Sequence, residues 1–174
     1  MVSVTRKVCL LGEFSVGKTS IARRYVTGTF SPDYHATLGV NIYKFSDTWT
    51  SDAGQDIEAN LLIWDIEGGE LAPGLRESYI TGAAGALVVG DISRATTLEA
   101  LAGHAEMFNT EAPGRPLAFA LNKADLDAAV EAEAVEQALA DRFDAPQRRV
   151  SAATGDQIVD LFRGLTERIV RVGV

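Results

Sequence analysis

The sequence contains a single cysteine, Cys9, so no disulfide can form within the chain. This scarcity fits a reducing compartment, and we expect a cytoplasmic protein. Cys9 lies in the apolar stretch of residues 4–11, where a free thiol is expected to pack in the interior rather than to react.

Positive charge is also in short supply. The chain has 16 Lys and Arg residues against 24 Asp and Glu residues, which gives a net charge of −8. A surface that binds nucleic acid needs a basic patch, and an acidic protein is repelled by anionic membranes. We therefore expect no nucleic-acid partner. An acidic protein can still bind phosphates where a local loop supplies a positive field.

Signals for membrane attachment are missing as well. The sequence has no run of ~18 apolar residues, which a spanning helix would need. It begins Met1-Val2 rather than Met-Gly, so we expect no N-myristoylation, and residues 171–174 do not match a prenylation box. We expect no autonomous membrane anchor in this chain.

Histidine is scarce, and the two that occur, His35 and His104, are isolated in the sequence. A metal site built from histidine needs clustered ligands, and neither such a cluster nor a Ser/His/Asp pattern is visible. The acidic run Glu131, Glu133 and Glu136 is interpreted as a solvated helix face.

Apolar runs alternate with helical patterns along the chain, which predicts a single α/β domain over residues 1–174. The expected sheet has six strands and is mostly parallel, with one antiparallel hairpin and helices on both faces. Expected buried strands are 4–11, 85–90, 117–121 and 149–151, with a hairpin of 40–50 and 57–64 around a turn at 51–54. Expected helices are 19–27, 96–108, 129–143 and 157–172.

Residues 12–19, Gly-Glu-Phe-Ser-Val-Gly-Lys-Thr, match the P-loop pattern G-x-x-x-x-G-K-[ST] between a buried strand and a helix. The glycines let the backbone turn its N–H groups toward phosphates, and the helix N-terminus adds a partial positive charge. Lys18 supplies a full charge to the outer phosphates. The Thr19 hydroxyl can ligate Mg²⁺, which prefers oxygen. The motif indicates a nucleoside triphosphate without identifying the base.

The tetrapeptide Asn122-Lys123-Ala124-Asp125 follows the expected strand 117–121, at the sheet edge where ligands bind in such folds. The Asp125 carboxylate can accept hydrogen bonds from guanine N1–H and the 2-amino group, and adenine would leave it unpaired. Such a loss can cost on the order of 10⁴–10⁵ in discrimination. Asn122 can reach the purine N7 edge, and the stem of Lys123 can lie over the ring.

With these motifs in place, the chain resembles the Ras superfamily along almost its whole length, and its Rab-like branch most closely. Residues 64–68, Trp-Asp-Ile-Glu-Gly, resemble the W-D-x-x-G form of Rab-like members, and residues 151–153, Ser-Ala-Ala, resemble the S-A-K loop. Thr37 lies at the family spacing from Lys18 for the switch I threonine. Phe30 and Tyr34 fall where the family has aromatic residues.

The resemblance implies GTP and GDP as ligands, Mg²⁺ as cofactor and a P-loop NTPase G domain as the fold. Thr37 and Asp65 would bind Mg²⁺ together with Thr19, with Asp65 acting through water, and Gly68 would sense the γ-phosphate. The expected nucleotide-binding residues are Phe14, Ser15, Val16, Gly17, Lys18, Thr19, Ser20, Phe30, Tyr34, Thr37, Gly68, Asn122, Lys123, Asp125, Ser151, Ala152 and Ala153.

The same resemblance assigns the main-chain N–H of Ala152 to the guanine oxygen, so Ala153 in place of lysine should matter little. Segments 30–40 and 66–80 would be the switches that relax when the γ-phosphate leaves. Protein effectors, and an activating or exchange partner, would read these two segments.

Three residues depart from the family pattern. Gly69 stands where the family has the glutamine that orients the attacking water, so hydrolysis should be slow. The ring of Phe14 should project toward the γ-phosphate and switch II, where it would crowd an arginine finger or pack into the space left by Gly69. Glu67 would repel nearby phosphates. The expected catalytic residues are Lys18, Gly68, Gly69 and Glu70, with Glu70 as the substitute for the missing glutamine.

The sequence supports a slow GTPase switch and leaves an alternative open, a non-hydrolysing GTP-bound docking or scaffold module. A P-loop kinase for small molecules is disfavoured, because residues 122–125 and 151–153 are typical of guanine recognition and no separate lid is visible.

Overall fold

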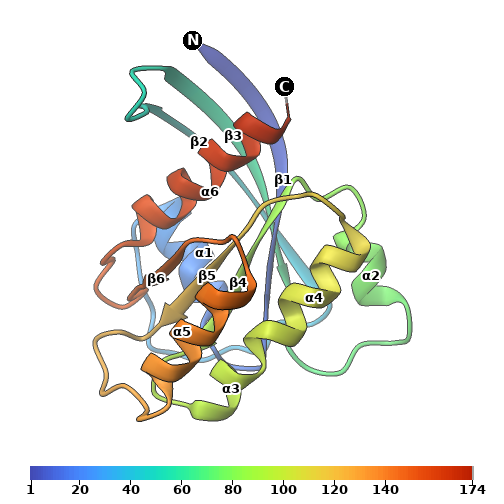
Figure 1. Cartoon of the computed structure of the whole chain (residues 1–174), viewed down its shortest axis with the longest axis vertical. Coiled ribbons are helices and arrows are strands. Elements are labelled where there is room, and N and C mark those ends of the chain that lie inside the picture. The colour runs from blue at the N-terminus through green and yellow to red at the C-terminus, as the bar shows by residue number, and fades with distance from the viewer. Residues whose placement is uncertain (174) are drawn as a thin grey trace.

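A computed structural model describes residues 1–173. It contains a six-stranded sheet, which helices cover (Figure 1). The strand order is β2-β3-β1-β4-β5-β6. β2 pairs antiparallel with β3, whereas β1–β3, β1–β4, β4–β5 and β5–β6 pair in parallel. The strands are β1 (Val2–Gly12), β2 (Val40–Thr50), β3 (Asp56–Ile66), β4 (Gly85–Asp91), β5 (Leu117–Asn122) and β6 (Gln147–Arg149).

The helices lie on both faces of the sheet, as expected from the sequence. They are α1 (Lys18–Thr27), α2 (Leu75–Ile80), α3 (Ala95–Glu99), α4 (Leu101–Glu111), α5 (Ala132–Arg142) and α6 (Ile158–Val172). Alternate residues of β1 point to opposite faces. Val8 and Leu10 pack with α1 and α6 in one hydrophobic core, and Cys9 and Leu11 pack with α2, α3, α4 and α5 in the other.

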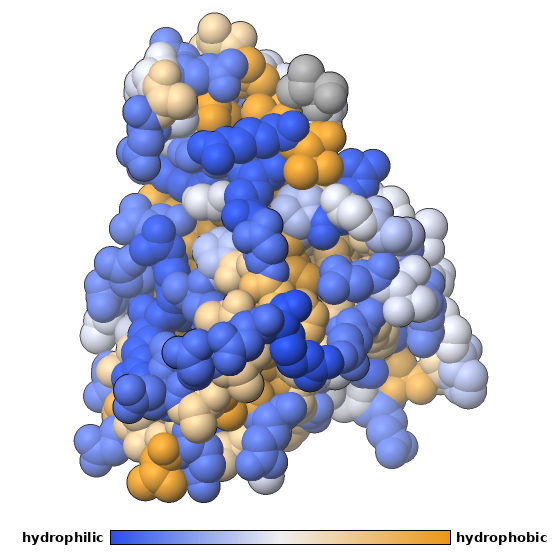
Figure 2. Space-filling model, viewed as in Figure 1, coloured by the Kyte–Doolittle hydropathy of each residue, from blue (hydrophilic) through white to orange (hydrophobic). Residues whose placement is uncertain are grey.

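The apolar patterns explain these elements. Every residue of β4 and β5 is buried, as expected for parallel strands covered on both faces. Helix α6 buries Ile158, Leu161, Phe162, Leu165 and Ile169, at helical spacing along one face. On the face shown in Figure 2, hydrophilic residues predominate and hydrophobic ones form small separate groups.

Some boundaries differ from the sequence prediction. The expected helix 96–108 is divided at Ala100 into α3 and α4, and the expected strand 149–151 forms two residues earlier as β6. Helix α2 was not predicted. The expected hairpin is confirmed, with a tight turn closed by a hydrogen bond from the Gly54 N–H to the Ser51 carbonyl. The last residue of the predicted domain, Val174, lies outside the described residues.

The topology places four strand ends at one edge of the sheet. Because β1, β3, β4 and β5 run in parallel, their carboxyl ends at Gly12, Ile66, Asp91 and Asn122 lie on the same side. Ligands bind at this edge in open α/β sheets. The start of β1 and the end of α6 lie at the same end of the molecule (Figure 1). Within residues 1–173, no helix is long and apolar enough to cross a membrane.

Candidate nucleotide-binding site

A cavity of about 390 Å³ lies at this edge of the sheet. Most of the predicted site residues line it: Phe14, Ser15, Gly17, Lys18, Thr19, Ser20, Phe30, Tyr34, Thr37, Asp65, Gly68, Asn122, Lys123, Asp125, Ala152 and Ala153. Val16 and Ser151 are buried and do not line the cavity. Gly69 and Glu70 do not line it either. Arg23, His35 and Leu126 line the cavity without having been predicted.

The turn from β1 into α1 depends on glycine at two positions. Gly12 and Gly17 have φ of 153° and 96°, a region that side chains rarely adopt. A Cβ at Gly12 would lie 2.2 Å from the Val89 carbonyl oxygen, and one at Gly17 would lie 2.3 Å from Asn122 Nδ2. The glycines of the P-loop motif therefore permit close packing against β4 and β5 as well as an unusual backbone.

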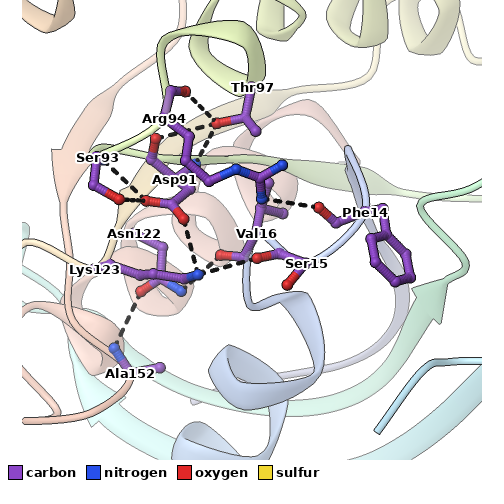
Figure 3. A network of polar contacts seen from close by, with 10 residues as sticks. All are labelled: Phe14, Ser15, Val16, Asp91, Ser93, Arg94, Thr97, Asn122, Lys123 and Ala152. Atoms are coloured by element: carbon purple, nitrogen blue, oxygen red, sulfur yellow. Dashed lines mark hydrogen bonds and ion pairs between the residues drawn. The ribbon is translucent and has the colours of Figure 1, made fainter. Parts of the chain in front are cut away.

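Side chains at and just after the carboxyl ends of β4 and β5 hold the P-loop carbonyls (Figure 3). The carbonyls of the consecutive residues 14, 15 and 16 accept hydrogen bonds from Arg94 Nη1 at 3.3 Å, Lys123 Nζ at 3.1 Å and Asn122 Nδ2 at 3.0 Å. In a planar trans peptide the N–H points opposite to the C=O. Because these carbonyls point toward Arg94, Lys123 and Asn122, the N–H groups of the residues that follow them point in the opposite direction. Such N–H groups suit an anion-binding loop. Arg94 in this role was not predicted.

Asp91 fixes the lysine of this network. Its carboxylate lies 2.8 Å from Lys123 Nζ, and it also accepts hydrogen bonds from the N–H and hydroxyl of Ser93. Although burial acts to raise the pKa of Asp91, the hydrogen bonds from Lys123 and Ser93 hold it below its ordinary value. Asp91 therefore stays charged and keeps Lys123 against the P-loop.

Lys18 is enclosed by the loop it follows. Its side chain donates to the carbonyls of Gly12 at 3.1 Å and Glu13 at 3.0 Å, and only 6% of the residue is exposed. Burial lowers the pKa of Lys18 to about 8, while the charge of Asp65 acts to raise it. Gly68 packs so closely that a Cβ there would lie 2.7 Å from Lys18 Nζ. Lys18 is therefore poised as a cation that an anionic ligand would stabilise.

Three oxygen-bearing side chains converge beside Lys18. Thr19 Oγ1 donates to Asp65 Oδ2 at 2.5 Å and lies 2.9 Å from Thr37 Oγ1, which is 3.4 Å from the same carboxylate oxygen. Asp65 Oδ1 is buried without a hydrogen-bond partner within residues 1–173. Burial raises the pKa of Asp65, and the hydrogen bond from Thr19 opposes this shift. An unpartnered carboxylate oxygen beside two hydroxyls is the hard donor set that suits Mg²⁺.

At the opposite end of the cavity, the loop after β6 meets the loop after β5. The Ser151 hydroxyl donates to Asp125 Oδ1 at 2.7 Å, and the Ala152 N–H donates to Asn122 Oδ1 at 3.2 Å. Ser151 therefore holds the Asp125 carboxylate toward the cavity that Asp125 lines. The Ala152 N–H, expected to face a ligand, already has a protein acceptor in Asn122.

The structure corrects the expected surroundings of Phe14. Its ring packs edge-on against the ring of Tyr34, with centroids 5.5 Å apart and an interplanar angle of 76°. Beyond the neighbouring residues, a Cβ at Gly69 would have only Glu67 Oε1 within 4 Å in the described chain, at 3.8 Å. Phe14 thus contacts the segment 30–40 rather than filling the space beside Gly69.

Glu67 also lies differently from the expectation that its carboxylate faces the phosphates. Glu67 Oε2 accepts the Gly39 N–H at 2.8 Å, and the Glu67 N–H donates to the Gly39 carbonyl at 2.8 Å. Arg76 Nη2 donates to the carbonyls of Glu67 at 3.3 Å and Gly69 at 2.5 Å. Glu67 does not line the cavity and instead joins the start of β2 to the end of β3. Glu70 is exposed, and its catalytic role stays a prediction.

Comparison with known proteins identifies relatives over most of the chain. A model of the Ras family matches residues 7–171. Ras-related protein Rab-32B of Dictyostelium discoideum is 32% identical over 176 residues, covering 95% of this chain and 65% of that protein. GTP-binding protein ypt5 of Schizosaccharomyces pombe is 32% identical over 174 residues, covering 97% and 80%. Ras-related protein Rab-32 of Homo sapiens is 43% identical over 95 residues, covering 55% and 40%. The chain thus spans less than two thirds of the length of both Rab-32 relatives.

Proposed function

The chain belongs to the Ras family, and from this premise we propose that it is a Rab-like switch that binds GTP and GDP with Mg²⁺ and hydrolyses GTP slowly. One observation carries the proposal. A single cavity has the P-loop with Lys18 and Thr19 at one end and Asp125, held by Ser151, at the other. A guanine nucleotide has its triphosphate and its base at matching ends.

The P-loop binds the phosphates through the N–H groups that its outward carbonyls leave facing the cavity, and through the Lys18 ammonium. Thr19, Thr37 and Asp65 are the residues that would hold Mg²⁺. When bound, the ion neutralises charge that develops on the phosphate oxygens. Thr37 belongs to the segment 30–40, so its position near Thr19 links that segment to the phosphate end.

Asp125 selects guanine because its carboxylate can accept from both N1–H and the 2-amino group, whereas adenine offers neither donor. Asn122 braces this end by donating to the Val16 carbonyl and accepting from the Ala152 N–H. Base recognition is therefore built onto the P-loop itself. A shift of the P-loop would displace Asn122 and, through it, the loops that bind the base.

Hydrolysis is proposed to be slow because the residue after Gly68 has no side chain with which to orient water. Arg76 holds the Gly69 carbonyl, which fixes the backbone without supplying the missing amide. Single-turnover hydrolysis should run at or below ~10⁻⁴–10⁻³ s⁻¹, the intrinsic scale of such switches. Absence of any turnover would instead favour a GTP-bound docking module.

Segments 30–40 and 66–80 are proposed as the surfaces that effectors and an activating or exchange partner read. Residues 29–38 and 67–74 carry no helix or strand, so they can rearrange with little loss of regular structure. Leu38 is 84% exposed, and Tyr34 contacts Phe14 of the P-loop. A partner that binds here would sense the phosphate end of the cavity directly.

Nucleotide identity tests the proposal most directly. Extraction of the purified protein followed by chromatography should release GDP or GTP, and a competition titration should favour GDP over ADP by several orders of magnitude. Equal affinity for ADP and GDP would overturn the guanine assignment. Loss of preference in Asp125→Ala alone, with folding intact, would place that preference at the carboxylate.

A further inference from the structure

Arg24 joins helix α1 to the base-reading loop at residues 151–155. Its Nε donates to the Ala152 carbonyl at 2.8 Å and its Nη2 donates to the Ala153 carbonyl at 2.6 Å. Its Nη1 donates to the Gly28 carbonyl at 2.8 Å, just beyond the end of α1. The guanidinium therefore spans two carbonyls of a loop that is more than a hundred residues away in the sequence.

The loop is shaped to receive this side chain. Gly155 has a positive φ of 87°, and a Cβ there would lie 3.6 Å from Arg24 Cδ, so the arginine stem packs beneath the turn. The Gly155 N–H donates to the Ser151 carbonyl at 2.7 Å, and the Thr154 N–H donates to Ser151 Oγ at 3.1 Å. The loop is thus a closed turn, and Arg24 fixes its orientation relative to α1.

The peptide geometry shows what this fixing achieves. The carbonyl of Ala152 shares a planar trans peptide with the N–H of Ala153, so that N–H points away from Arg24. Both alanines line the cavity, whose base end is marked by Asp125. The planar fork of arginine suits this task, because it can hold two carbonyl oxygens in a fixed arrangement.

Two separate supports serve the base end of the cavity. Ser151 Oγ holds the Asp125 carboxylate, which can read N1–H and the 2-amino group. Arg24 holds the carbonyls of residues 152 and 153. The Ala152 N–H donates to Asn122 Oδ1 and the Thr154 N–H donates to Ser151 Oγ, so the Ala153 N–H is the donor that this stretch can offer to a ligand. The 6-oxo group of guanine can accept a hydrogen bond from this N–H, whereas the 6-amino group of adenine would face it with another donor.

We infer that Arg24 is a positioning residue that sets recognition of the 6-oxo group of guanine, an inference that rests on the proposed guanine-nucleotide function. Arg24 acts through the main chain of Ala152 and Ala153 and touches no reacting atom. Its contribution is distinct from that of Asp125, so the two can be separated by changing one atom of the base at a time.

The test compares GDP with two analogues. In 6-thio-GDP the 6-oxo group becomes sulfur, a weaker acceptor, while N1–H and the 2-amino group remain. In IDP the 2-amino group is absent and the 6-oxo group remains. Dissociation constants for all three ligands are measured on wild type, Arg24→Ala and Arg24→Lys. Arg163→Ala is the matched control, because Arg163 also donates two hydrogen bonds but to Asp47 rather than to the loop at residues 151–155.

Wild type should bind GDP about five- to tenfold more tightly than 6-thio-GDP, the scale of one neutral hydrogen bond. In Arg24→Ala the dissociation constant for 6-thio-GDP should be less than about twice that for GDP. The ratio of the dissociation constants for IDP and GDP should stay at its wild-type value. Arg24→Lys keeps the charge without the fork, so its ratio should also fall. Arg163→Ala should lower the unfolding temperature and leave both ratios unchanged.

The inference is overturned if neither Arg24 variant lowers the ratio of the dissociation constants for 6-thio-GDP and GDP. It is also overturned if the ratio for IDP and GDP falls together with it, because that would mean a general loosening of the cavity. Circular dichroism identifies the folded variants, and Arg24→Lys decides the matter if Arg24→Ala does not fold. A wild type without preference for GDP over ADP would refute the proposed function itself. A wild type that prefers GDP, with unchanged ratios in the Arg24 variants, would refute only the inference.

Discussion

The contact between Phe14 and Tyr34 predicts that the P-loop and the segment 30–40 are energetically coupled. Both residues line the cavity, with 50% and 57% exposure, and their rings meet edge to face. Such aromatic pairs contribute about 0.5–1.5 kcal/mol beyond buried area, and half-exposed rings belong at the lower end. A coupling energy of about 0.5–1 kcal/mol corresponds to about a twofold to fivefold change in rate.

The perturbation is a double-mutant cycle on the release of a nucleotide. Phe14→Ala and Tyr34→Ala should each speed release of a fluorescent, non-hydrolysable GTP analogue in excess Mg²⁺. Because each substitution removes the same ring contact, the double variant should be slower to release than the product of the two single effects implies. Stopped-flow displacement by unlabelled nucleotide gives the four rates.

A second cycle supplies the control. Phe14→Ala combined with Gly69→Gln should be additive within about 0.3–0.5 kcal/mol, because the space around the Gly69 Cβ position contains Glu67 rather than Phe14. Additivity between Phe14 and Tyr34 would refute the reasoning. Strong coupling between Phe14 and Gly69 would show that the aromatic ring occupies the switch II side when nucleotide is bound.

Three further predictions concern the base, the metal and the phosphate lysine. Asp125→Asn should shift preference from GDP to XDP, since the amide can donate to the 2-oxo group of xanthine; unchanged preference in a competition titration would remove Asp125 from base recognition. EDTA should speed release of GDP from wild type, because Asp65 Oδ1 and its neighbouring hydroxyls suit Mg²⁺; a rate insensitive to EDTA would remove the ion from the site. Burial lowers the pKa of Lys18 to about 8, so GDP affinity should fall by up to about tenfold per pH unit above pH 8, where binding must take up a proton. Lys18→Met should bind weakly with a flatter pH profile, and an equally steep profile in that variant would assign the titration elsewhere.

The sequence predicts those parts of the site in which the backbone geometry dictates the residue type. Gly12, Gly17 and Gly68 each leave no room for a Cβ, so their spacing in the motifs reports a physical constraint. Parallel strand order then brings these loops to one edge of the sheet, because short strands joined by helices must end on the same side. The predicted nucleotide-binding residues therefore lie around one cavity, although they are dispersed over residues 14–153.

Contacts made by long side chains between distant segments could not be read in this way. Arg24 reaches a loop 128 residues away, and Arg94 reaches the P-loop 80 residues away, with no periodic signal in either case. Helix α2 has only six residues, too few to establish a helical pattern. The division into α3 and α4 at Ala100 was not predicted, because the backbone of this residue stays in the helical region, with φ of −77° and ψ of −13°.

Glu67 illustrates how such a contact changes the interpretation of slow hydrolysis. The sequence suggested three separate obstacles, at Phe14, Glu67 and Gly69. In the structure the Glu67 carboxylate accepts a hydrogen bond from the Gly39 N–H. The Glu67 carbonyl accepts one from the Arg76 side chain. Glu67 thus joins the segments 30–40 and 66–80 through its contacts with Gly39, and its carboxylate is engaged there rather than lining the cavity.

The remaining obstacle is the missing side chain at Gly69. Arg76 holds the Gly69 carbonyl at 2.5 Å, and a rearrangement that let Glu70 take the place of the glutamine would have to break this hydrogen bond. Glu70 is exposed, and a carboxylate would also have to approach the negative γ-phosphate. We therefore propose that efficient hydrolysis uses a group from outside the chain to orient water, and the catalytic role of Glu70 stays a prediction. A partner bound over the segments 30–40 and 66–80 is in the position to supply one, and it would have to displace or accommodate the ring of Phe14 to do so.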